Sequence, residues 1–163
     1  MTLKADLPPE DWTRLKRAPC VAGMAISLAD PGGPIEAFKE TAATLRTVLD
    51  AAEKGDHGQF VAEVARDVAE DARSRKDPLA GFRPKGARAG EEILEELRAV
   101  NRILSEHATP AEAQAFREWL LATAKAAADA AKEGGFLGFR AERVSEGEQQ
   151  MLDKLAQVFS TPA

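Results

Sequence analysis

Six acidic residues lie close to two glycine-containing turns, and their oxygens could together bind a hard metal ion. They lie near the turns at 30–33 and 133–135, and are Asp30, Glu36, Glu40, Glu133, Glu146 and Glu148. Calcium and magnesium need several converging carboxylate and carbonyl oxygens, so the sequence predicts a divalent-cation site if the two turns meet. The alternative is that the acids stabilise helix starts. Glu148 would then form a capping box with Ser145, and Glu36 and Glu146 would favour the positive helix ends.

A second candidate site is a basic segment that could hold an anionic group or an acidic partner. Its bases include Arg75, Arg83, Lys85 and Arg88, with Asp77 as the one acid among them. Clustered cations can bind phosphate or RNA, and Phe82 could stack on a base. The alternative is a solvated loop whose charges keep it soluble. No nucleic-acid motif accompanies the bases, and the formal net charge of −5 also disfavours nucleic acid as the partner.

Side chains that commonly catalyse reactions are sparse in this chain. His57 and His107 have no glutamate three residues before them, so a ferritin-like metal pair is not expected. Cys20 lies in an apolar stretch, where a thiol is normally inert core and burial raises its pKa. The sequence contains no Ser-His-Asp set, Walker loop or dinucleotide fingerprint. A non-enzymatic role is therefore favoured, although the residues leave the question open.

Composition places the chain among globular intracellular proteins. Its 163 residues are 44% hydrophobic and 30% charged, which suits one domain with its own core, spanning residues 1–163. A single cysteine excludes an internal disulfide and fits a reducing compartment. The N-terminal residues carry acids and prolines where a signal peptide would be basic and apolar. We therefore expect a cytoplasmic protein, and the longest uncharged run, 18–29, is too short to span a membrane.

Apolar spacing of three and four residues, with helix start and stop signals, predicts an all-α fold without strands. The chain should form a compact bundle of about seven helices, joined by short turns except at a mobile loop of about 76–90. Pro19 is expected to end the first helix, and Asp56 to cap the fourth. The expected helices are 8–17, 18–29, one from Pro34 to the Gly55 stop, one from Asp56 to about Arg75, about 91–107, one from Pro110 to the Gly134 stop, and one opened by Ser145.

Two stretches of the chain are similar to each other. In each, an alanine-rich helix ends at an acid, a glycine pair follows within two residues, and an amphipathic helix leads away. This pattern resembles the tellurite-resistance-protein-B-like (TerB-like) all-helical family, in which such a unit occurs twice. The C-terminal residues that carry the resemblance are Ala131, Glu133, Gly134, the run 144–148, Leu152 and Leu155. The N-terminal ones are Ala29, Asp30, Gly32, Gly33, Ile35 and either Glu36 or Glu40.

The chain departs from the family pattern at three points: Pro31 separates the acid from its glycines, Glu133 replaces an aspartate, and 136–143 is an insertion. A pseudo-repeat of helix-turn-helix units and a chance likeness both stay open, because a helix that stops at glycine is common. The resemblance implies a cytoplasmic domain in a metal-linked or chemical-stress pathway such as tellurite resistance, with an acidic surface that binds cations.

Three hypotheses for the function follow from the sequence. The first is a TerB-like domain that binds a divalent cation or a protein partner. The second is an enzyme or ligand-binding protein that uses a pocket between helices for an anionic small molecule. The third is an interaction module without a small ligand, acting on a protein partner or as a homo-oligomer. Fold-level likeness alone does not decide among them.

Overall fold

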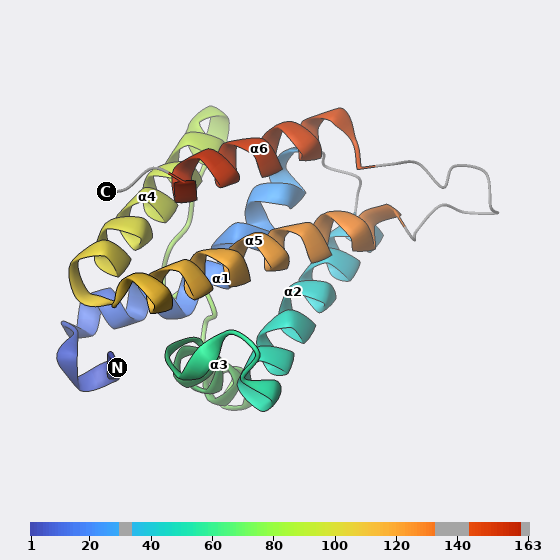
Figure 1. Cartoon of the computed structure of the whole chain (residues 1–163). Coiled ribbons are helices and arrows are strands. Elements are labelled where there is room, and N and C mark those ends of the chain that lie inside the picture. The colour runs from blue at the N-terminus through green and yellow to red at the C-terminus, as the bar shows by residue number, and fades with distance from the viewer. Residues whose placement is uncertain (30–33, 133–143, 161–163) are drawn as a thin grey trace.

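The computed structural model describes residues 1–29, 34–132 and 144–160, without the side chains of 34–39 and 131–132. The described residues form six α-helices, two short 3-10 helices and no strand, which confirms the all-α prediction (Figure 1). None of these helices is long and apolar enough to cross a membrane. The α-helices are α1 (Pro9–Ala29), α2 (Pro34–Lys54), α3 (Gly58–Arg73), α4 (Ala89–His107), α5 (Pro110–Lys132) and α6 (Glu146–Ser160).

The predicted break at Pro19 is wrong, and this explains why six helices replace about seven. Pro19 lies buried in the middle of α1, which is continuous from Pro9 to Ala29. Proline removes one backbone hydrogen bond and crowds the preceding turn. Buried side chains on both sides of it, such as Leu15, Ala18 and Ala22, pack into one core. Their burial offsets the cost of the proline, so the helix continues.

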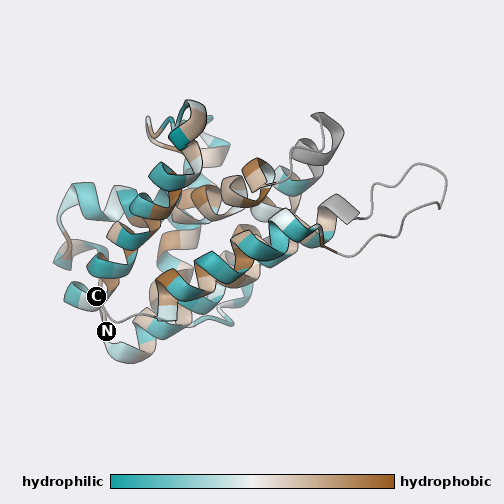
Figure 2. Ribbon diagram, turned by 90° about the horizontal axis from the view of Figure 1, so that it is seen from above, coloured by the Kyte–Doolittle hydropathy of each residue, from teal (hydrophilic) through white to brown (hydrophobic). Residues whose placement is uncertain are grey.

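The core lies between α1, α3, α4 and α5, α2 adds Val48 and Ala51 to it, and α6 closes it along α1, α4 and α5 (Figure 1). Four aromatic rings run through it in sequence, with centroids 6.3 Å apart for Trp12 and Phe60, 5.8 Å for Phe60 and Phe116, and 5.2 Å for Phe116 and Trp119. Edge-on and tilted contacts of this kind add to the stabilisation from burial. The helices present hydrophilic residues outward, as Figure 2 shows.

Two helix starts carry the capping boxes that the sequence predicts. Thr109 and Glu112 exchange hydrogen bonds at the start of α5, and Ser145 and Glu148 do so at the start of α6. The prediction that Asp56 caps the next helix is wrong. Helix α3 begins at Gly58, one residue later than a cap at Asp56 requires, so its N-cap is His57. The His57 side chain forms no capping hydrogen bond.

Glu112 also anchors the N-terminal segment to α5. Its carboxylate accepts hydrogen bonds from the Thr2 backbone N–H at 2.9 Å and the Thr2 hydroxyl at 2.8 Å, in addition to the bonds from Thr109. Burial by itself would raise the pKa of Glu112, but the hydrogen bonds from Thr2 and Thr109 lower it to about 2. The charged carboxylate is therefore favoured in the folded state.

We expect Glu112→Gln to remove part of the acid sensitivity of the fold. Since the folded pKa lies below the unfolded one, the stabilisation is present above about pH 4.5 and is lost as the pH falls toward about 2. Because Glu112 is partly exposed and its interactions are screened by solvent, its charge should contribute only about 1 kcal/mol to the free energy of unfolding. Urea unfolding between about pH 5.5 and pH 3 measures it. Glu118→Gln, in the same helix, is the control, and equal pH slopes in both variants would contradict the prediction.

Candidate functional site

A cleft of about 460 Å³ opens between α1, α2, the end of α3 and the segment 76–80. The side of α1 that faces it carries Thr13, Arg17, Cys20, Met24 and Ser27, at steps of three and four residues. This spacing places them along one helical face. The opposite face of α1 is buried in the core. One face of α1 therefore packs in the core, and the other lines the cleft.

The floor of the cleft is formed where α1 and α2 approach closely. At Gly23 in α1, the side chain of any other residue would begin at a point that collides with the Thr44 hydroxyl of α2. Glycine is therefore needed for the two helices to come this near. Val48 of α2 is fully buried beside this crossing, whereas Leu45 of the same helix is 42% exposed. The middle of the cleft is consequently apolar and open to solvent.

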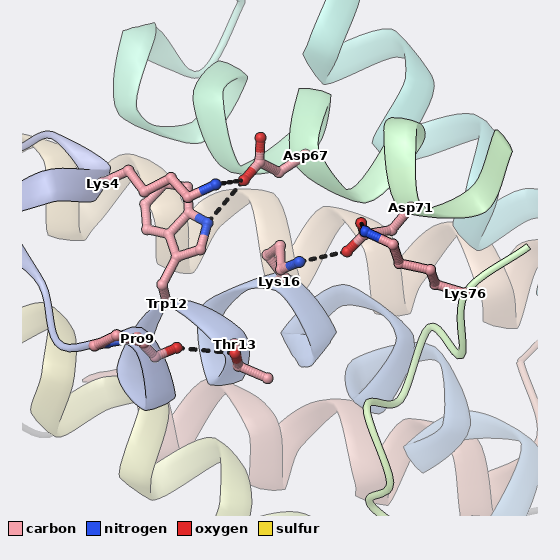
Figure 3. A network of polar contacts seen from close by, with 8 residues as sticks. All are labelled: Lys4, Pro9, Trp12, Thr13, Lys16, Asp67, Asp71 and Lys76. Atoms are coloured by element: carbon pink, nitrogen blue, oxygen red, sulfur yellow. Dashed lines mark hydrogen bonds and ion pairs between the residues drawn. The ribbon is translucent and has the colours of Figure 1, made fainter. Parts of the chain in front are cut away.

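One end of the cleft is charged, and Figure 3 shows the groups that meet there. Asp71 of α3 accepts a hydrogen bond from Lys16 of α1 on one carboxylate oxygen and from Lys76 on the other, the latter at 2.9 Å. Hydrogen bonds from Lys16 and Lys76 lower the pKa of Asp71, and the bond to Asp71 raises the pKa of Lys76. One carboxylate is thus shared by two ammonium groups.

The other end of the cleft is polar and carries an acid. Glu40 of α2 is 2% exposed and accepts a hydrogen bond from the Ser27 hydroxyl of α1. Thr41 and Thr44 lie near it on the same helix. The cleft therefore has an acidic, buried end and a lysine-rich end, with apolar side chains between them.

Arg17, which follows Lys16 in α1, contacts Glu96 on one side and Phe82 on the other. Its Nε donates to Glu96 of α4 at 2.8 Å, and its guanidinium lies over the Phe82 ring at 5.3 Å from the centroid. Arg14 binds the second oxygen of Glu96 at 3.0 Å. These contacts fix the Arg17 side chain beside the cleft, and Arg17 shares the negative charge of Glu96 with Arg14.

Asp77 forms the hydrogen bonds that stabilise the segment 77–83, after α3. Its carboxylate accepts hydrogen bonds from the backbone N–H groups of Leu79 at 3.1 Å and Gly81 at 2.7 Å, and from Arg83 at 2.9 Å. Hydrogen bonds from Gly81, Leu79 and Arg83 lower the pKa of Asp77. These contacts shape the edge of the cleft. The predicted mobility of the loop at about 76–90 stays a prediction.

The predicted cation ligands do not form a recognisable site in the described part of the chain. Asp30 and Glu133 lie outside the described residues, and so does the side chain of Glu36. Glu40 lies at the acidic end of the cleft, and Glu146 is exposed. Among the described residues, no group of three or more His, Cys, Asp or Glu side chains could hold a metal ion.

Glu148 takes the role that the sequence offered as the alternative, since it completes the capping box with Ser145. One contact does bring the flanks of the two turns together. Gly147, at the start of α6, lies against the backbone carbonyl of Ala29, at the end of α1. The two turns themselves, 30–33 and 133–135, lie outside the described residues. The cation site and the pseudo-repeat therefore stay predictions.

The predicted anion contacts are not among the residues that line the cleft. All four side chains, Arg75, Arg83, Lys85 and Arg88, are exposed, and Arg83 pairs with Asp77. The cations that line the cleft are Lys16, Arg17 and Lys76. Sequence reasoning missed the first two because the expected break at Pro19 divided the helical face that carries them.

Cys20 lines the cleft and is half-buried, so its expected place in the core is wrong. The expected direction of its pKa is confirmed. Burial, with a smaller effect of nearby Asp77, raises the pKa of the thiol to about 11. The thiol therefore stays protonated at neutral pH and is a weak nucleophile.

Comparisons with known proteins found no matching family model, no matching curated protein and no matching solved structure. The resemblance to the TerB-like family therefore rests on the residues of the two turn regions alone. The link to metal or stress responses stays a prediction of that resemblance.

Proposed function

We propose that this protein binds an elongated, largely apolar small molecule in the cleft between α1 and α2. The observation that supports this most directly is an open concavity of about 460 Å³ whose middle is apolar. Leu45 is 42% exposed there, although it faces the concave side of the fold. A ligand that covered such a surface would gain free energy by removing apolar area from water.

The shape of the cleft favours a long ligand over a round one. Its lining on α1 extends from Thr13 to Ser27, which corresponds to about 21 Å along the helix axis at the usual rise per residue. The volume lies within the usual range for small-molecule sites. An acyl chain or a similar extended molecule fits both properties.

The groups around the cleft favour binding over catalysis. The Cys20 thiol has a pKa of about 11, so it is protonated at neutral pH. Lys16 and Lys76 are engaged with Asp71, and Arg17 is engaged with Glu96. Charged groups with such partners are suited to holding a ligand in one orientation. The hypotheses of a protein partner and of a homo-oligomer stay predictions from the sequence.

Filling the cleft should abolish binding. Ala72 is exposed on α3 and borders the cleft, so Ala72→Trp would place a large ring in the ligand's volume without disturbing the core. We expect the variant to bind Nile red at least about tenfold more weakly than the unaltered protein, which corresponds to about 1.4 kcal/mol. Fluorescence titration of the dye, with 1-octanol as a competitor, measures this.

The matched control is Ala122→Trp, which adds the same ring at an exposed alanine of α5 that does not line the cleft. It should leave dye binding unchanged. Absence of saturable dye binding to the unaltered protein would overturn the proposed function. Equal loss of binding in both variants would show that the dye does not bind in the cleft.

A further inference from the structure

We infer that the ligand is an amphipathic anion, with one negatively charged head group held by Lys16 and Lys76 and an apolar tail along α1 and α2. This inference rests on the proposed function and adds the chemical class and the orientation of the ligand. It follows from the way charge is distributed along the cleft.

The lysine-rich end already binds a carboxylate in the folded protein. Lys16 and Lys76 approach Asp71 from two sides, so that each ammonium group occupies one carboxylate oxygen. An ammonium group has three donor hydrogens, and these contacts use one on each lysine. Lys76 is 65% exposed, so its remaining donors can turn toward the cleft mouth. With a ligand carboxylate bound there, the two positive charges of Lys16 and Lys76 would match the two negative charges of Asp71 and the ligand.

The charges packed around this end leave it with a positive excess. Asp67, one turn earlier on α3, binds Lys4 and the Trp12 indole, and Asp77 binds Arg83. Glu70 on the same helix pairs with Arg73. The carboxylates near the two lysines thus have cationic partners of their own, apart from the one carboxylate that the lysines share. An anionic ligand bound at Lys16 and Lys76 would neutralise this positive excess.

The opposite end of the cleft determines which way the ligand lies. Glu40 is buried there and accepts a hydrogen bond from Ser27, and the lining of this end, Ser27, Glu40, Thr41 and Thr44, includes no lysine or arginine to bind a second carboxylate. A dicarboxylate long enough to reach both ends is therefore disfavoured. The site selects a single anionic head at Lys16 and Lys76, with the tail extending past Cys20 toward Met24.

Three probes with the same tail and different head groups test this directly. Octanoate, 1-octanol and octylammonium should compete with Nile red for the protein in fluorescence titrations. We expect octanoate to bind at least about tenfold more tightly than 1-octanol, and octylammonium to bind most weakly. Octanol binding as tight as octanoate binding would overturn the charge inference and leave the proposed function standing. Failure of all three to displace the dye would overturn both.

Variants at the head-group site give effects of opposite sign. Lys16→Met with Lys76→Met keeps apolar stems but removes both ammonium groups, and should weaken octanoate binding about tenfold while leaving 1-octanol unchanged. Asp71→Asn removes the competing carboxylate, and should tighten octanoate binding severalfold. A merely structural role of Asp71 would weaken both ligands alike, and that result would overturn the inference.

Lys54→Met is the matched control, since Lys54 is an exposed lysine paired with Asp50 at a site outside the cleft. It should leave the affinities for all three probes unchanged. Circular dichroism confirms that each variant is folded before titration. If Lys54→Met loses as much octanoate affinity as the double variant, the effect comes from the overall charge of the protein. That result would overturn the inference.

Discussion

Replacing Glu96 with glutamine should lower the free energy of unfolding by about 2 to 3 kcal/mol, because it leaves guanidinium groups without their counter-charge. Glu96 is 7% exposed and binds Arg17, which is 13% exposed, through both Nε and Nη2 at 2.8 Å and 2.6 Å. Arg14, at 38% exposed, can turn to water, whereas Arg17 is confined beneath Phe82. Urea unfolding at neutral pH measures the loss.

A control in the same helix separates this effect from the general cost of removing a carboxylate. Glu91→Gln breaks the ion pair with Arg98, in which both side chains are about half-exposed, and should cost less than about 0.5 kcal/mol. Adding Arg17→Met to Glu96→Gln should recover part of the lost stability, since no confined charge remains unpaired. Equal losses in Glu96→Gln and Glu91→Gln would show that burial of the pair contributes nothing.

Glu96 also illustrates what the pattern of residues could reveal and what it could not. In the sequence, Glu96 is one of several acids within the expected helix at about 91–107, and this position alone suggests no specific partner. Nothing in the local spacing indicates that it lies opposite Arg14 and Arg17, which are 82 and 79 positions earlier in the chain. Pairings over such sequence distances depend on how helices pack, which periodicity does not encode.

Local signals were predictable because they act within a few residues. The all-α class follows from apolar spacing, and the capping boxes at Thr109 and Ser145 follow from a hydroxyl and a glutamate three residues apart. Pro19 was misjudged because the expected break relied on the cost of proline alone. Packing on both sides of Pro19 outweighed that local cost.

The error at Pro19 also concealed the candidate site. A helix that spans residues 9–29 places Lys16, Cys20 and Ser27 on one face, whereas two separate helices do not. The bases clustered after α3, which the sequence predicts as an anion site, have exposed side chains. The residues of α1 that line the proposed site recur at steps of three and four between Thr13 and Ser27. This spacing becomes visible only when that helix is treated as continuous.

Gly147→Ala should destabilise the protein by about 2 kcal/mol, even though alanine is the better helix former. A Cβ atom at this position would lie 2.6 Å from the backbone oxygen of Ala29, which no side-chain rotation can move. The start of α6 would have to shift away from the end of α1. That shift would strain the packing of Met151 and Leu155 against the core.

Gly90→Ala is a matched control, since Gly90 is likewise the second residue of a helix, but a Cβ atom added there would meet no atom within 4 Å. It should raise the stability by about 0.5 kcal/mol, because alanine lowers the entropy of the unfolded chain. Opposite signs in thermal or urea unfolding would locate the cost of Gly147→Ala in its contact with Ala29. A stabilising effect at both positions would mean that α6 does not rest on α1. It would also contradict the close approach of Gly147 to Ala29, which lies next to the first of the two glycine turns.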